Sequence, residues 1–144
     1  MIEIAELHQQ NHKITETSNV YLYLIRDRAM CDTEVAGQLL FEYVQRVSEH
    51  LDLVDRQMAS RLLTDKDPRA QTLARQFVAE SSFLKKLIGE YAKRWTRKAK
   101  PVLFIKDHGS FVRDSSEIIE LVLNRIQRET EHLYPLWRAY LNAG

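Results

Sequence analysis

The sequence contains little of what specifies disulfides, tight turns or membrane spans. It has 1 cysteine, 4 glycines and 3 prolines in 144 residues. A single cysteine excludes an internal disulfide and a cysteine-rich zinc site, and it is typical of a reducing compartment. No apolar run approaches the length of a membrane-spanning helix, and residues 1–10 lack the basic and apolar segments of a signal peptide. We therefore expect a cytoplasmic protein without membrane contact.

An excess of either charge is also missing. Lys and Arg number 21 and Asp and Glu number 20, which gives a formal net charge of +1. This balance provides no long-range attraction for nucleic acid, so a nucleic-acid partner is not expected. Hydrophobic residues make up 44% of the chain and charged residues 28%, which is typical of a globular protein with its own core. We expect a single domain over residues 1–144.

What the sequence does contain is helical periodicity. Apolar residues recur at spacings of three and four over four long segments. These predicted helices are residues 2–28, 33–63, 68–98 and 110–141. Asp67 and Pro68 provide an N-cap and a first-turn proline for the third helix, while Pro135 predicts a kink or break in the fourth. Residues 101–106 are the one candidate strand. Four long helices with short connections predict an all-α, up-down-up-down four-helix bundle.

A few polar residues fall on the apolar faces of these helices. Glu129 lies at the centre of the apolar face of the fourth helix, with Arg125 one turn before it at the edge. His50 lies on the apolar face of the second helix, and Ser81 is the inward polar residue of the third. The first helix has a polar stripe beside its apolar face, formed by His8, Asn11, His12, Thr15, Ser18 and Asn19. Bundles bind metals through side chains that point inward from several helices, so these are the candidate site residues.

Three segments resemble the hemerythrin-like (HHE) domain family. They are "NHKI" at 11–14, "EHLDLVDRQM" at 49–58 and "NRIQRETEHLYPLW" at 124–137, of which "RETEHLYP" is the most specific part. The helix count, spacing and order extend the resemblance over the whole chain. It implies a hemerythrin-like four-helix fold. It also implies a di-iron site, in which the second and fourth helices each supply a histidine followed four residues later by a carboxylate.

The metal-ligand set that this resemblance implies is incomplete in this sequence. His12 and His50 match the histidines of the first and second helices, and Glu129 matches the carboxylate of the fourth. Arg125 stands in place of the fourth-helix histidine and has no lone pair for a metal. Val54 replaces the carboxylate expected after His50, and the third-helix histidine has no counterpart. Two irons need several imidazoles and at least two carboxylates, so reversible oxygen binding is not expected.

Two interpretations of this interior stay open. In the first, Arg125 takes the place of the metal and forms a core ion pair with Glu129, which predicts a regulatory or interaction protein without a cofactor. In the second, His12, His50 and Glu129 hold a single metal, with iron implied by the resemblance, in an iron- or oxygen-responsive protein. The simpler structural alternatives are a rotated helix that exposes both charges to solvent, and a His50 that is only a hydrogen-bonded core residue.

A third functional hypothesis rests on two short segments. "HLDLVDR" and "RIQRE" are similar to segments of the regulator-of-sigma-D family, which implies an anti-sigma-like helical regulator of bacterial type. No glycine-rich phosphate loop, nucleophile motif or pair of catalytic carboxylates occurs in the sequence, so we do not expect an enzyme. We expect a protein partner, with a homodimer left open.

One basic cluster provides a candidate surface for such a partner. It lies at the end of the third predicted helix and consists of Lys93, Arg94, Trp95, Arg97 and Lys98. Basic residues at a helix C-terminus also interact favourably with the helix dipole, which is the simpler interpretation. The functional interpretation is a docking patch for an acidic partner.

Overall fold

The computed structural model describes residues 3–97 and 100–143, and over these ranges the protein is almost entirely helical. The described residues form five continuous helices, four of them long. The first long helix is α1 (Ile4–Ile25), which is followed by the short α2 (Arg28–Cys31). The second consists of α3 (Glu34–Val54), the π-helical turn η1 (Asp55–Ala59) and α4 (Ser60–Leu62). The third is α5 (Pro68–Trp95), and the fourth consists of α6 (His108–Arg128), the π-helical turn η2 (Glu129–Leu133) and α7 (Tyr134–Ala143).

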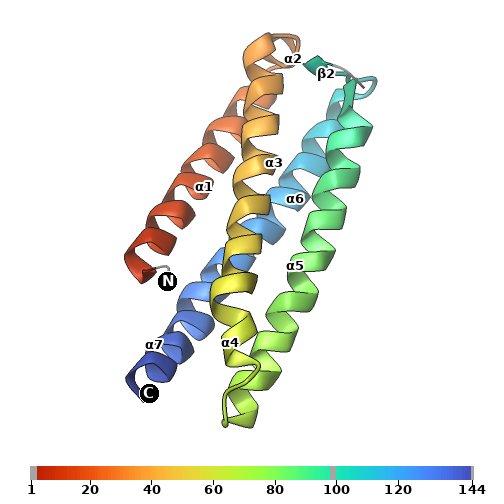
Figure 1. Cartoon of the computed structure of the whole chain (residues 1–144). Coiled ribbons are helices and arrows are strands. Elements are labelled where there is room, and N and C mark those ends of the chain that lie inside the picture. The colour runs from red at the N-terminus through yellow and green to blue at the C-terminus, as the bar shows by residue number, and fades with distance from the viewer. Residues whose placement is uncertain (1–2, 98–99, 144) are drawn as a thin grey trace.

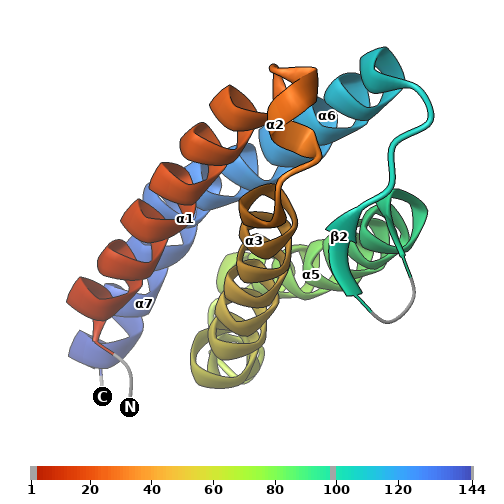
Figure 2. The same ribbon diagram turned by 90° about the horizontal axis from the view of Figure 1, so that it is seen from above.

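The four long helices run alternately in opposite directions (Figure 1). α1 packs against α3 and α6, and α5 packs against the same two helices, so the four close into a ring around a shared interior. Seen from above, α1 lies along the fourth helix, and α3 lies between α1 and α5 (Figure 2). The all-α prediction is confirmed. Within the described ranges, no helix combines the length and apolar character that a membrane span requires.

The helices end earlier than the apolar periodicity predicted in two places. The first ends at Ile25, and the third ends at Trp95 because Thr96 takes an extended backbone conformation. The Thr96 hydroxyl donates to the Ala92 carbonyl at 2.5 Å, and the Phe104 amide donates to the Trp95 carbonyl at 2.7 Å. These bonds satisfy carbonyls that the end of the helix leaves free.

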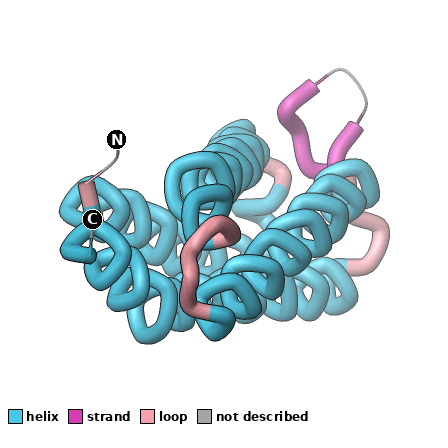
Figure 3. The backbone as a smooth tube through the Cα atoms, turned by 60° about the horizontal axis from the view of Figure 1, so that its bottom comes forward, coloured by secondary structure: helices cyan, strands magenta, loops and turns pink. Residues whose placement is uncertain are grey.

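A small hairpin follows the third helix. β1 (Thr96–Arg97) pairs antiparallel with β2 (Lys100–Leu103), so the predicted strand at 101–106 is partly confirmed, with its end at Leu103. The hairpin lies at the opposite end of the helices from the first turn of α1 and the end of α7 (Figure 3). It packs against α3, and its residue Leu103 is buried in the hydrophobic core.

The two predicted proline effects have different outcomes. Pro68 lies in the first turn of α5, and the Asp67 carboxylate caps the helix by accepting from the Arg69 amide at 2.9 Å, as predicted. Pro135 does not interrupt the fourth helix, which continues to Ala143. Its missing N–H and bulky ring disturb the preceding turn, and the wider π-helical turn η2 lies at that place.

The core consists of two hydrophobic clusters separated by polar side chains. The cluster toward the hairpin contains Ile14, Leu84 and Ile126, and the cluster toward the chain termini contains Leu7, Phe77 and Leu133. Buried polar residues lie between these clusters on every long helix. We call them the polar layer, which consists of Asn11, His50, Ser81, Arg125 and Glu129. The layer therefore crosses the whole ring of helices at one level.

Candidate functional site

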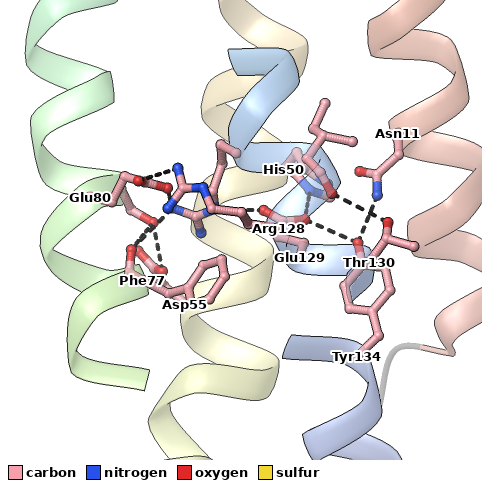
Figure 4. Close-up of polar contacts among 12 residues, drawn as sticks. Asn11, His50, Asp55, Phe77, Glu80, Arg128, Glu129, Thr130 and Tyr134 are labelled. Atoms are coloured by element: carbon pink, nitrogen blue, oxygen red, sulfur yellow. Dashed lines mark hydrogen bonds and ion pairs between the residues drawn. The ribbon is translucent and has the colours of Figure 1, made fainter. Parts of the chain in front are cut away.

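Glu129 is the centre of the polar layer, and its carboxylate is fully buried (Figure 4). Its Oε1 atom lies 2.7 Å from Nε2 of His50 and accepts the Tyr134 hydroxyl at 3.0 Å. Its Oε2 atom accepts Nε of Arg125 at 2.8 Å. These contacts replace the water that an ionised carboxylate loses on burial. Both oxygens of Glu129 are therefore bonded to groups of the protein itself.

Arg125 is the fixed positive charge beside this carboxylate, and its side chain is only 1% exposed. One terminal nitrogen donates to the Phe77 carbonyl at 3.1 Å and to Oε1 of Glu80 at 3.3 Å. The guanidinium lies over the Phe77 ring, 4.7 Å from its centroid. Glu80 is also paired with the more exposed Arg128. Arg125 thus joins the fourth helix to α5 by charge, hydrogen bonds and stacking.

His50 and Tyr134 connect the same carboxylate to α1. Nδ1 of His50 lies 2.7 Å from Oε1 of Gln10, and the Asn11 amide donates to the Tyr134 hydroxyl at 2.8 Å. Because a carboxylate only accepts, His50 presents a protonated Nε2 to Glu129. Burial raises the pKa of Tyr134, and the negative charge of Glu129 raises it further, so this hydroxyl remains a donor.

The charges in the layer determine the ionisation of Glu129. Burial alone would raise the pKa of this carboxyl, but the hydrogen bond and charge of His50, and then those of Arg125, outweigh burial and hold the pKa below its usual range. Glu129 is consequently ionised at neutral pH. Arg125 and Glu129 form a buried ion pair, and neither side chain reaches solvent as a rotated helix would require.

Two π-helical turns border the polar layer. η1 begins at Asp55, and η2 begins at Glu129 itself. The Ser81 hydroxyl links the layer to η1, because its oxygen lies 2.9 Å from both Oδ1 of Asp55 and the Phe77 carbonyl oxygen, which share its single proton. Burial raises the pKa of Asp55, although the Ser81 hydrogen bond opposes that effect. π-Helical turns are rare and occur frequently at functional sites, so their position beside the layer marks it as the candidate site.

The structure brings together two of the three predicted metal ligands, His50 and Glu129, but not the third. The His12 side chain is 82% exposed, with Nε2 3.7 Å from a carboxylate oxygen of Glu16. Its neighbour Asn11 enters the layer in its place. Across residues 3–97 and 100–143, no three His, Cys, Asp or Glu side chains form a group that could hold a metal ion.

The residues present do not fit the di-iron site that the family resemblance implies. A divalent ion at Glu129 would have to displace the His50 and Arg125 hydrogen bonds that occupy the carboxylate. Arg125 would then place a permanent positive charge beside the metal and could donate no electron pair to it. The donor set suits an internal guanidinium better than a pair of metal ions.

Sequence reasoning missed three members of this site: Gln10, Glu80 and Tyr134. Glu80 and Gln10 are long side chains that reach the layer from partly exposed positions. Their helical positions alone therefore gave no signal. Tyr134 gave none either, because five residues are about 140° apart around a regular α-helix, and the π-helical turn η2 lies between Glu129 and Tyr134.

Only part of the predicted basic cluster is exposed at the surface. Lys93, Arg94 and Arg97 are exposed, but Trp95 is buried and its Nε1 donates to Asp114 at 3.1 Å. Lys98 lies outside the described residues. Trp95 therefore contributes to the core, and only the cations around it are available to a partner.

Comparison with known proteins found no significant match to a protein-family model, to a curated protein or to a solved structure. The fold and the site together define an all-α protein of four long helices crossed by a buried ionic layer.

Proposed function

We propose that this chain is a hemerythrin-like four-helix protein in which the guanidinium of Arg125 replaces the metal ions of that family. On this proposal it acts as a non-catalytic regulatory or interaction protein. The observation that carries the proposal is the saturation of Glu129: its two carboxylate oxygens accept from His50, Tyr134 and Arg125. Arg125 supplies inside the fold the positive charge that a metal would otherwise supply.

The burial of the layer supports a role without catalysis. Asn11 is its most exposed member and is still buried, while Ser81 and Glu129 are fully covered. A substrate would reach these groups only after the helices separated. The layer is then best understood as the element that fixes the relative register of four helices, a use of buried polar groups that is well attested in helical bundles.

The metal content of the protein tests this proposal. The protein is produced in iron-supplemented cells, purified without chelator, and analysed by mass spectrometry for metals and by absorption spectroscopy. We expect far less than one metal ion per chain and no visible absorption. Two irons per chain with an oxo-bridged absorption band would overturn the proposal.

An Arg125→His variant provides the matched comparison. This substitution removes the internal cation and adds an imidazole beside His50 and Glu129, so the variant should retain more iron than the wild type after the same purification. Equal, negligible iron in both proteins would show that Arg125 is not what excludes the metal.

The adjacency of His50 and Glu129 favours one second candidate, a protein that binds a single metal. It predicts about one metal per chain in the wild type, lost in His50→Ala. Because His12 is exposed, His12→Ala should retain that metal. Metal retained by His50→Ala would eliminate this second candidate.

A further inference from the structure

Two clefts meet at the side chain of Phe104, which is 39% exposed at the hairpin end of the helices. One has a volume of about 420 Å³ and the other of about 370 Å³. We call them the hairpin clefts. Their charged lining residues are Arg28, Asp32 and Arg97 in the larger cleft, and Arg94, Lys106 and Asp107 in the smaller one.

Both carboxylates in the hairpin clefts are already bonded. Asp32 accepts from Arg28 at 2.8 Å. Asp107 is the N-cap of α6, and one of its oxygens accepts the Ser110 amide at 3.2 Å. Arg94 is satisfied as well, since it pairs with Asp114 at 3.2 Å. The acidic groups at this end therefore do not neutralise the remaining two cations.

Those two cations are Arg97 and Lys106, and both lie over the Phe104 ring. The Arg97 guanidinium carbon is 4.7 Å from the ring centroid, and the Lys106 ammonium is 5.7 Å from it. Among the described residues, the ion pairs within 4.0 Å include neither Arg97 nor Lys106. The ring holds the cations in place without satisfying their hydrogen bonds, so they are positioned to receive carboxylates.

We propose that the hairpin clefts bind an acidic segment of a partner protein, an inference that rests on the proposed interaction function. Carboxylates of the segment pair with Arg97 and Lys106, and an apolar side chain of the segment packs on the half-buried Val102 and Ile105. The segment therefore carries carboxylates that complement the two cations and an apolar side chain that packs on Val102 and Ile105.

Two features favour a peptide over a nucleic acid. Asp32 and Asp107 line the clefts and would repel a continuous run of phosphates. The Phe104 ring, which could otherwise stack on a base, is already in contact with two cations. A peptide can place single carboxylates at Arg97 and Lys106 and avoid the two aspartates.

Selection from a phage-displayed library of short random peptides tests the inference on the full chain. We expect the selected peptides to contain an excess of Asp and Glu beside an apolar residue. Their affinity, measured by fluorescence anisotropy, should fall by at least about tenfold in the double variant Arg97→Glu, Lys106→Glu. The charge-matched control is Arg75→Glu, Lys86→Glu, which changes two exposed cations of α5 that do not line the hairpin clefts and should change affinity less than about twofold.

Three results would overturn the inference: selected peptides without acidic excess, equal losses in the two double variants, or tighter binding of a single-stranded DNA oligonucleotide that the cleft variant abolishes. The outcome is separable from that of the metal analysis. Iron-free protein that selects no acidic peptides contradicts only this inference. Protein with two irons per chain that still selects them contradicts only the loss of the metal site.

Discussion

The four helices enclose two buried polar clusters that differ in charge. The polar layer contains an ion pair, whereas the cluster nearer the hairpin, here called the tyrosine cluster, is built from hydroxyls. In it the Tyr21 hydroxyl lies 2.8 Å from that of Tyr91, which also bonds Ser115. Tyr43 stacks on Tyr21 with ring centroids 6.5 Å apart. Each long helix contributes to both clusters, so the same four helices accommodate both kinds of polar interior.

The difference between the clusters lies in what each group requires. Burial raises the pKa values of Tyr21, Tyr43 and Tyr91, so these groups stay neutral and need only hydrogen bonds. Regular α-helix is sufficient to hold them. The charges of Arg125 and Glu129 need compensation as well as hydrogen bonds, and they are accompanied by two π-helical turns. Removing one group should therefore cost far more in the polar layer than in the tyrosine cluster.

The largest effect is expected for Arg125→Ala. This change leaves the carboxylate of Glu129 buried without its cation and should lower the free energy of unfolding by about 3–5 kcal/mol. Urea-induced unfolding followed by circular dichroism measures it. The control is Arg128→Ala, which removes an arginine that is 45% exposed and paired with Glu80, and which should cost less than about 1 kcal/mol. Equal costs for the two arginines would contradict a buried ion pair.

A double substitution sharpens the same prediction. Arg125→Leu combined with Glu129→Leu removes both charges at once, so neither is left uncompensated. The double variant should be less destabilised than the sum of its two single variants, and the difference measures the coupling between the residues. Additive costs would show that each charge is stabilised independently of the other.

The next effect is a dependence on pH that only the polar layer should show. Because the folded protein holds the pKa of Glu129 below its usual value, the stability from this carboxylate is complete above about pH 4.3, the ordinary glutamate pKa. It is lost as the pH falls through the lower, folded pKa. Glu129→Gln should cost about 1.5–3 kcal/mol at pH 7, since it removes charge-assisted hydrogen bonds. Unfolding curves should show this cost shrinking in acid, and a cost that is constant with pH would contradict it.

The sequence predicts the polar layer better than it predicts the way in which the layer is assembled. His50 and Glu129 could be placed inside because each falls on a clear apolar face. The resemblance assigns His12 to the interior, but six of the seven buried residues of α1 follow spacings of four and three that include the neighbouring Asn11. That stripe is Leu7, Asn11, Ile14, Ser18, Tyr21 and Ile25. Helical spacing was the better guide, since a one-residue step turns a side chain by about 100°.

Other features lay beyond reasoning about single helices. The end of the third helix at Trp95 depends on pairing between β1 and β2, and the apolar spacing does not encode this pairing. Glu80 contacts Arg125 of the polar layer only because α5 packs beside α6. Such contacts between helices are determined by tertiary packing, whereas the apolar spacing describes each helix separately.

A smaller effect is expected in the tyrosine cluster. Tyr91→Phe removes the hydroxyl that bonds both Tyr21 and Ser115, and it should cost about 1 kcal/mol at any pH between 4 and 8, because no charge is involved. Urea unfolding at several pH values measures this cost, with Glu129→Gln measured in parallel. A cost for Tyr91→Phe that varied with pH as that of Glu129→Gln does would remove the distinction between the two clusters.

The smallest effect is expected for Tyr43→Phe. The Tyr43 hydroxyl is buried and makes no hydrogen bond of ordinary length and angle among the described residues, because Ser18, the side chain that lowers its pKa, donates to the Ile14 carbonyl at 2.8 Å. Its removal therefore relieves a poorly compensated burial and leaves the stacked ring in place. Stability should stay within about 0.5 kcal/mol of the wild type or rise. Thermal unfolding measures this change, and Tyr21→Phe is the control. The control removes the same atom in the same cluster and should cost about 1 kcal/mol. Equal losses for the two tyrosines would show that Tyr43 has a partner, so that hydrogen bonding rather than burial alone holds all three hydroxyls.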